Sequence, residues 1–421
     1  MTKKRRLAAR GTGLGLRAGL LAAGMAATVL AGCSCEGPGL RRAEEWDRMP
    51  NIRVLLGHDA SEASVSVGGP WTMLRPGAGE AASSEAMPWT RLSVRGAEIL
   101  VGGESAGLGP VTIRPGRDAT LRLRQAVRGK TRERTYRGAL RIARTREGAL
   151  RLINILPVEA YLAGVLRNEL YPNWPPAIYE AQAVAARTYA LMERHRRGRY
   201  DFDVYDSTQS QAYGGFESET EKAWQALRAT WGVVATFTGA DGRVHLVRTY
   251  YHSTCGGATA PVAAVFGGRA DAPLGGVACP FCAGSNRYRW GEVVLTKRGV
   301  GAALRGSGVA ALVALGEVRT VEVAETSQGG RASRIRVVDA AGRAVRIRAS
   351  DWRGLMGASK VPSTVFRIED RGDRIALVDG RGFGHGVGMC QWGAAYLAEH
   401  GKSGEEILRY YYPGVRLARA Y

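Results

Sequence analysis

Three features are scarce in this sequence of 421 residues, and each scarcity restricts its function. Acidic residues are few beside basic ones, 38 Asp and Glu against 59 Lys and Arg, so the formal charge is +21. This imbalance favours an anionic partner such as a wall polymer, a membrane surface or nucleic acid, although an arginine-rich solvated surface is the simpler alternative. Zinc-finger, helix-turn-helix and RNA-binding signatures are missing, so we expect no nucleic-acid partner.

Long apolar runs are the third scarcity, because none beyond residue 33 is long enough to span a bilayer. Residues 1–33 combine a basic segment, an uncharged stretch over residues 18–32 and a final Leu-Ala-Gly-Cys, as in a lipoprotein signal peptide. An ordinary signal peptide that happens to precede a cysteine is the alternative. We predict an exported protein lipidated at Cys33 and anchored to a membrane. Because Ser34 follows Cys33, the periplasmic face of the outer membrane is the expected location in a diderm cell.

The rest of the chain predicts an α+β fold. Residues 34–49 are polar and aperiodic, as expected of a tether. Residues 50–156 form short strand-like segments between turn residues, which predicts a β-rich module. From residue 157 to 418 the pattern is mixed, with helices predicted over 157–170 and 176–195 and strands over 317–349. The last part carries a glycine-rich GHGVGMCQ motif and a further helix over 389–400.

Glu169 stands out in the first predicted helix. At 100° per residue it lies about 20° from Val158, within the apolar stripe of that helix. A glutamate whose head group reaches solvent, or pairs with a core arginine, is the simpler interpretation. Burial would raise the pKa of the carboxyl group, which a general acid acting at neutral pH requires.

A second group of residues has metal-ligand spacing. His252 and Cys255 form an H-x2-C pair, and Cys279 and Cys282 form a C-x2-C pair 23 residues further on. Four such ligands fill a tetrahedral shell, which predicts a structural zinc ion that stabilises this loop. A Cys279–Cys282 or Cys255–Cys282 disulfide is the alternative in an oxidising compartment.

In the glycine-rich run, His385 is a candidate to line a sugar groove, together with Gln391 and Trp392 just beyond it. Alternating glycines permit backbone angles that other residues avoid, and they let another chain come close. A tight packing loop with His385 hydrogen-bonded internally explains the same pattern. A nucleophilic pair of Cys390 and His385 is conceivable, but the spacing supports it poorly.

Three stretches together resemble the stage II sporulation protein D family, which includes amidase-enhancer proteins. They are residues 152–191, 250–268 and 380–415, and the weaker run 351–368 fits as well. The likeness extends over roughly residues 50–418. Characterised members look like lytic transglycosylases, so the resemblance implies an enzyme that cleaves the glycan strands of peptidoglycan.

The resemblance also assigns roles to individual residues. The family's catalytic glutamate precedes an A-x-A-A-R-T-Y helix and maps to Glu169. Candidates for substrate contact are Arg187, Tyr189, Asp206, Gln211 and Tyr213. Some relatives carry Cys and His metal ligands in the loop after that helix, where this chain has Tyr205, Gln209 and Ser210. Cys390 occupies the position of a common serine, which argues against a required nucleophilic thiol.

Such an enzyme needs one carboxyl group, because the C6 hydroxyl of the substrate is the nucleophile and the product has a 1,6-anhydro end. Ordinary glycosidases use two carboxyl groups. The rival hypothesis is a non-catalytic wall-binding regulator that enhances a partner peptidoglycan amidase.

Overall fold

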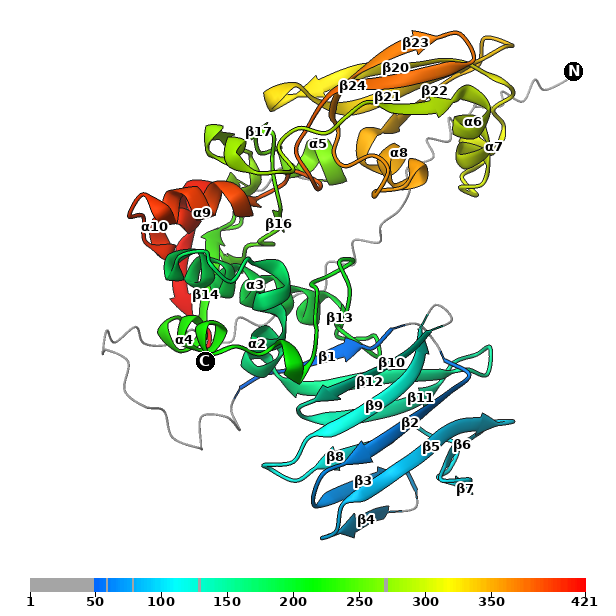
Figure 1. Ribbon diagram of the computed structural model, residues 1–421, viewed down its shortest axis with the longest axis vertical. Helices are drawn as coiled ribbons and strands as arrows, with labels where there is room; N and C mark the ends of the chain where they lie inside the picture. The colour runs from blue at the N-terminus through cyan, green and yellow to red at the C-terminus, as the bar shows by residue number, and fades with distance from the viewer. Residues whose placement is uncertain (1–48, 58–59, 78, 128–129, 269–271) are drawn as a thin grey trace, which may run out of the picture. The chain divides into compact units, whose positions relative to one another are not determined.

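The computed structural model describes residues 49–57, 60–77, 79–127, 130–268 and 272–421 (Figure 1). The predicted leader, the lipidation site Cys33 and the tether up to residue 48 lie outside the described residues. The fold class is α+β, as predicted. Within the described part of the chain, no helix combines the length and apolar character that crossing a bilayer requires.

Two sheets, antiparallel except at one edge strand, make up most of the N-terminal module. The first contains, in spatial order, β13 (Val204–Tyr205), β1 (Asn51–Leu55), β12 (Leu150–Pro157), β11 (Ala139–Arg144), β8 (Val111–Pro115), β3 (Trp71–Arg75) and β4 (Gly79–Ser83). The second contains β10 (Lys130–Tyr136), β9 (Leu121–Val127), β2 (Glu62–Val67), β5 (Met87–Arg95), β6 (Glu98–Val101) and β7 (Glu104–Ser105). Buried and accessible residues alternate along strands such as β2, where Ala63, Val65 and Val67 are buried. This period of two is typical of a half-buried strand.

Strand β13 belongs to this sheet although it comes from later in the chain. It pairs in parallel with β1, through Val54 with Val204 and Leu55 with Tyr205. The pairing holds the start of the loop that runs from residue 206 to 215 against the sheet. That loop therefore has a defined position relative to the helix that follows β12.

The helices follow the predicted pattern. α2 (Val158–Glu169) begins after Pro157, and α3 (Pro176–Arg196) begins after Pro175. Proline suits a helix start because its missing N–H has no intrahelical partner there. α4 (Glu221–Ala229), α9 (Gln391–Glu399) and α10 (Gly404–Tyr411) contact α3. At Gly164 of α2 a Cβ atom would lie 2.6 Å from Cε2 of Tyr213, so only glycine allows this close packing.

A second β module lies within the region predicted as mixed, and it has its own hydrophobic core around Trp352. Its two sheets are β19 (Val293–Thr296), β24 (Arg374–Arg381) and β23 (Val365–Arg371), and β20 (Val318–Ser327), β21 (Arg331–Asp339) and β22 (Ala344–Arg348). Its helices are α6 (Lys297–Arg305), α7 (Ala310–Val313) and α8 (Ala349–Met356). The strands predicted over 317–349 are confirmed.

Short elements connect these parts. They are η1 (Phe216–Ser218), β14 (Val233–Thr238), β15 (Val244–Leu246), β16 (Tyr251–His252), β17 (Gly257–Ala258), α5 (Val262–Phe266), η2 (Ala272–Leu274), β18 (Ala278–Cys279), η3 (Pro280–Gly284), η4 (Gln328–Gly330), β25 (Met389–Cys390) and β26 (Arg416–Arg419). The pairing that matters most is β16 with β25, which are parallel and place Tyr251 beside Met389 and His252 beside Cys390. Two distant motifs of the sequence thereby become neighbours.

Candidate active site

Glu169 is the last residue of α2, and its carboxylate is held by three segments of the chain. The backbone N–H of Ala212 donates a hydrogen bond to Oε1 at 2.8 Å. The side chains of Tyr251 and Gln391 also hydrogen-bond to the carboxylate. Residues 158–166 of the helix are buried, whereas residue 169 as a whole is only partly buried. The carboxyl group is therefore fixed by contacts with other parts of the protein.

The surroundings of Glu169 change its acidity. Burial raises its pKa above the ordinary value, because a low-dielectric environment disfavours the charged form. The hydrogen bonds from Ala212, Gln391 and Tyr251 act in the opposite direction and only partly offset the burial. No other carboxyl group of the described residues contributes to this shift. Glu169 thus has the character of an isolated acid that holds its proton at higher pH than a free glutamate.

Buried amides and phenols support the partners of Glu169. The Gln211 amide donates to the hydroxyl of Tyr251 at 2.9 Å, and its carbonyl oxygen accepts from the hydroxyl of Tyr161 at 3.1 Å. The Gln391 amide donates to Oε1 of Gln182 at 3.4 Å. Gln182 is fully buried, and its Nε2 has no hydrogen-bond partner among the described residues. The network fixes the positions of the groups that touch the acid.

Sequence reasoning found some of these residues and missed others. The structure brings Gln211 and Gln391, both predicted substrate contacts, into the network around Glu169. It also adds Tyr251, Gln182 and the N–H of Ala212, which were not predicted. Tyr251 directly precedes His252, so it lay inside a motif already selected for another reason. A backbone N–H leaves no signal in a sequence.

Arg187 does not line the site, which corrects the prediction that it contacts substrate. Its side chain is fully buried and makes a two-point ion pair with Glu159, at 2.8 Å and 2.9 Å. Glu159 is equally buried and also accepts from the hydroxyl of Tyr421 at 2.6 Å. Arg187 donates further to the carbonyl of Val233 at 3.0 Å. Arg187 therefore joins α2, α3 and β14 in the core.

Three other predicted contacts are also buried or paired inside the protein. Tyr213 is buried, and its hydroxyl donates to Oδ1 of Asn154 at 2.9 Å. Asp206 makes an ion pair with Arg132 at 2.6 Å, and only 7% of its side chain is exposed. The ring of Tyr189 is buried and packs against Tyr250. In the structure these three side chains therefore contact other parts of the protein and stabilise the fold.

His385 lies in the glycine-rich loop next to a cluster of aromatic rings. Its ring contacts those of Tyr250, His252 and Phe266, with centroids 5.3 to 5.8 Å apart. The N–H of Val387 donates to Nδ1 at 3.0 Å, so the proton of the neutral ring is on Nε2. Burial, assisted by the charge of Arg331, lowers the pKa of His385 to about 4. His385 is therefore neutral at physiological pH and is hydrogen-bonded within its own loop.

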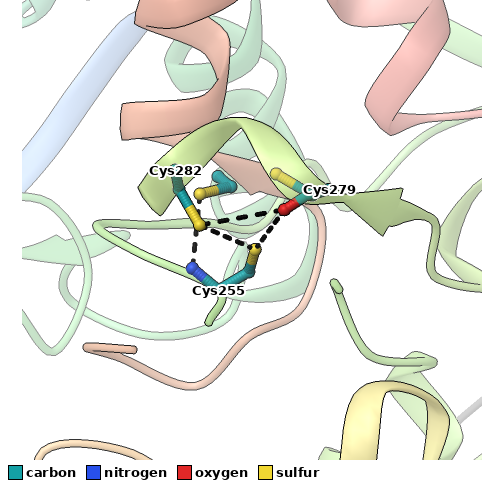
Figure 2. A group of neighbouring side chains, drawn as sticks. Cys255, Cys279 and Cys282 are labelled. Carbon is teal, nitrogen blue, oxygen red and sulfur yellow. Dashed lines mark hydrogen bonds between the residues drawn. The ribbon is translucent and has the colours of Figure 1, made fainter. Parts of the chain in front are cut away.

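The cysteines form a compact cluster, but its fourth member differs from the prediction. The thiols of Cys255, Cys279, Cys282 and Cys390 are all buried and lie within 4.8 Å of one another. Figure 2 shows Cys255, Cys279 and Cys282 with their side chains directed into one small space. His252 is not in this group of four, and its Nδ1 hydrogen-bonds the carbonyl of Val387 at 3.1 Å. The group that could hold a metal ion therefore contains Cys390 where the sequence spacing predicted His252.

The pairing of β16 with β25 explains the exchange of ligands. It places Cys390 beside His252, and the N–H of Cys255 donates to the sulfur of Cys390 at 3.3 Å. Cys390 is fully buried, and burial raises its pKa well above the ordinary value. The sulfur of Cys390 donates to the carbonyl of Ser253, and among the described residues no hydrogen bond joins it to His385.

The cysteine cluster has the dimensions of a metal site. Zinc–sulfur bonds of about 2.3 Å in a tetrahedron put the sulfur atoms about 3.8 Å apart. The sulfurs of Cys255 and Cys282 are 3.4 Å apart, and the whole set lies within 4.8 Å. The N–H of Gly257 donates to the sulfur of Cys255 at 3.4 Å, as expected for a sulfur that carries negative charge. The four cysteines could hold a metal ion.

Comparisons with known proteins fit this arrangement. Residues 146–237, which contain α2 and α3, match the family described as Stage II sporulation protein, and residues 282–388 match a domain of unknown function (DUF8618). An uncharacterised protein of Brachyspira hyodysenteriae is 35% identical over 265 residues, which cover 63% of this chain and 67% of the relative. Stage II sporulation protein D of Bacillus subtilis is 28% identical, over 63% of this chain and 75% of the relative. The Amidase enhancer of the same organism is 27% identical, over 61% of this chain and 40% of the relative.

The matched family region contains α2 and α3, and in the structure these helices and the loop after them surround one acidic group, Glu169. The chain belongs to the stage II sporulation protein D and amidase-enhancer family. This confirms the family that the sequence motifs predicted.

Proposed function

We propose that the protein is a lytic transglycosylase that cleaves the glycan strands of peptidoglycan, with Glu169 as its general acid and base. The observation that carries the proposal is the single carboxyl group of raised pKa, fixed by Ala212, Tyr251 and Gln391 on a residue that is only partly buried. A general acid needs its proton at the pH at which the enzyme works, and burial provides this.

The proposed reaction requires two proton transfers, and the carboxyl group of Glu169 takes part in both. Protonated Glu169 donates its proton to the glycosidic oxygen as the bond from that oxygen to C1 breaks. The resulting carboxylate then accepts the proton of the C6 hydroxyl as its oxygen forms a bond to C1. Cleavage gives two fragments. One carries a free hydroxyl at the former glycosidic oxygen, and the other ends in a 1,6-anhydro sugar. Water is not consumed, and Glu169 returns to its protonated form.

The other acids near these helices support a one-carboxylate mechanism. A hydrolase would use a second carboxylate to activate water or to attack the sugar. Glu159 is fully buried in its pair with Arg187, and Asp206 is bound by Arg132. Neither group is free for that role. In the proposed mechanism the attacking group comes from the substrate.

A zinc ion with a structural role fits the cysteine cluster. Four thiolates from Cys255, Cys279, Cys282 and Cys390 would complete its tetrahedral shell and leave no open position for a substrate. The ion would hold together two segments that carry partners of Glu169. Tyr251 lies on the strand next to β25, and Gln391 directly follows Cys390. A disulfide between Cys255 and Cys282 is the competing arrangement.

A regulator of a peptidoglycan amidase is the second candidate function. The observation that favours it is the similarity to a protein named Amidase enhancer. The charge of +21 is compatible with binding to an anionic wall polymer in either case. An enhancer would bind the wall and a partner without breaking glycosidic bonds.

The membrane anchor proposed at Cys33 would locate the protein at the cell envelope. Diacylglycerol with an amide-linked chain would hold the protein at the envelope more firmly than one acyl chain. The protein would then act on the wall from the periplasmic side, at the outer membrane in a diderm cell.

Product analysis separates the enzyme from the regulator. Purified protein is incubated with intact glycan strands and with strands stripped of stem peptides, and the products are read by mass spectrometry. The enzyme gives 1,6-anhydro ends from at least one substrate. No anhydro ends from either substrate, together with stimulation of an added amidase, would establish the regulator and overturn the proposed activity.

A further inference from the structure

Arg331 is a buried cation with no acidic partner. It is the first residue of β21 in the second β module, and only 1% of it is exposed. Among the described residues, no carboxylate lies within ion-pair distance of its guanidinium. It donates to the carbonyl of Cys255 at 2.7 Å and to the hydroxyl of Thr364 at 3.3 Å, and its Nε has no partner. A buried charge without a counter-charge strongly destabilises a folded protein.

The guanidinium is held tightly where it is. Gly386 of the glycine-rich loop has a φ of 84°, and a Cβ atom there would lie 2.4 Å from Cζ of Arg331. A side chain at this position would collide with the guanidinium. The loop therefore closes over Arg331, so the charge cannot move to solvent without unpacking it.

No carboxylate of the described residues balances the positive charge of Arg331, but the cysteine cluster could supply the negative charge. A divalent ion bound by four thiolates has a net charge of −2. Burial and the neighbouring Arg353 lower the pKa of Arg331, whereas negative charge on Cys255, Cys390 and Cys282, as in a tetrathiolate centre, would favour its charged form. Four neutral thiols or a pair of disulfides would leave the guanidinium without compensation.

We propose that Arg331 is the counter-charge of a tetrathiolate zinc centre formed by Cys255, Cys279, Cys282 and Cys390. This inference rests on the zinc ion of the proposed function. It makes the second β module part of the metal site, although all four ligands lie outside the strands of that module. Arg331 is a positioning residue, because it acts on the metal through the charge and backbone of the ligands.

The test measures metal binding in the purified full-length protein. Zinc content is determined by mass spectrometry, and affinity by competition with a chromophoric zinc chelator. Loss of a group that supports metal ligands typically weakens metal binding about 10- to 100-fold. We expect a loss of this size for Arg331→Met, which keeps the length of the side chain and removes its charge. Arg331→Lys restores the charge and should recover most of the affinity, which a purely steric role would not predict.

Arg353→Met is the matched control. Arg353 is a neighbouring arginine that bonds only backbone carbonyls, those of Ala358, Val361 and Pro362. Its loss removes a positive charge that repels Arg331, so zinc affinity should not fall. If Arg331→Met fails to fold, Arg331→Lys and Arg331→Gln compared by cobalt titration still separate charge from shape.

The outcomes distinguish this inference from the proposal beneath it. Wild-type protein with one zinc and an unchanged affinity in folded Arg331→Met or Arg331→Gln overturns the role of Arg331 and leaves the zinc site standing. Wild-type protein without metal overturns both. One zinc, a weakened affinity in the neutral variants and recovery with lysine support the inference.

Discussion

The backbone N–H of Ala212 holds Oε1 of Glu169 at 2.8 Å, and this contact joins the end of α2 to the loop that β13 fixes against the N-terminal sheet. A backbone donor cannot be replaced by mutation of its own side chain. The acid is thus placed by the fold of the loop, and the side chains of Tyr251 and Gln391 complete its surroundings.

Glu169→Gln should abolish formation of anhydro ends while leaving a folded protein that still binds glycan. General acid–base catalysis contributes roughly 10²- to 10⁴-fold, and a group that serves as both acid and base should lie at the upper end. Mass spectrometry of digested strands measures the loss. Glu180→Gln is the matched control, since burial also raises the pKa of Glu180 on α3 but no catalytic role is assigned to it. Equal activity of both variants would remove Glu169 from the mechanism.

The pH dependence of stability should carry the signature of Glu169. Its folded pKa is raised, so its contribution to stability is full below the unfolded pKa of about 4.3 and is lost as pH rises through the folded pKa. Glu169→Gln has no ionisable group at this position, so the variant should not lose stability there as pH rises. The variant should therefore match the wild type in unfolding free energy near pH 4 and equal or exceed it at pH 7. Greater destabilisation at pH 7 than at pH 4 would contradict the raised pKa.

Arg187→Met should unfold at markedly lower denaturant concentration. Removing one partner of a buried ion pair typically costs about 3–5 kcal/mol, because the other charge stays uncompensated. Here the remaining charge would be Glu159. The double variant Glu159→Gln with Arg187→Met should recover part of the loss. If Arg187→Met instead keeps full stability and weakens only glycan binding, Arg187 is a substrate contact after all.

Cys390→Ser and His252→Asn discriminate between the two possible fourth ligands. We expect loss of bound zinc and of thermal stability in Cys390→Ser. His252→Asn keeps a donor for the carbonyl of Val387 and should retain the metal. Metal analysis and thermal unfolding of both variants check this. The opposite result would restore the ligand set that sequence spacing suggested, and a Cys255–Cys282 disulfide in stable wild-type protein would exclude the metal.

Cys33→Ala should release the protein from the membrane fraction. The thiol is the attachment point for the lipid, so alanine leaves no site for acylation. Fractionation and mass spectrometry of the mature N-terminus measure the change. A wild-type protein whose mature N-terminus is not an acylated Cys33 would refute the anchor.

Much of the local structure was predictable because short-range periodicity controls it. The helices that became α2 and α3 follow from apolar spacing and proline starts, and the strands over 317–349 follow from alternation. The same spacing put Glu169 on the buried face of its helix. The separate core around Trp352 was not predictable, since periodicity does not say which strands share a core.

The sequence by itself determined the family, the candidate acid Glu169 and three of the four clustered cysteines, because each is encoded in residues close together along the chain. Only the tertiary structure decided the rest. Parallel pairing of β16 with β25 brings Cys390 to the cluster in place of His252, and it sets Tyr251 near Gln391. Burial of Glu159 beside Arg187 turned an expected ligand contact into a core ion pair. These outcomes depend on contacts between distant segments, whose energies no local pattern contains.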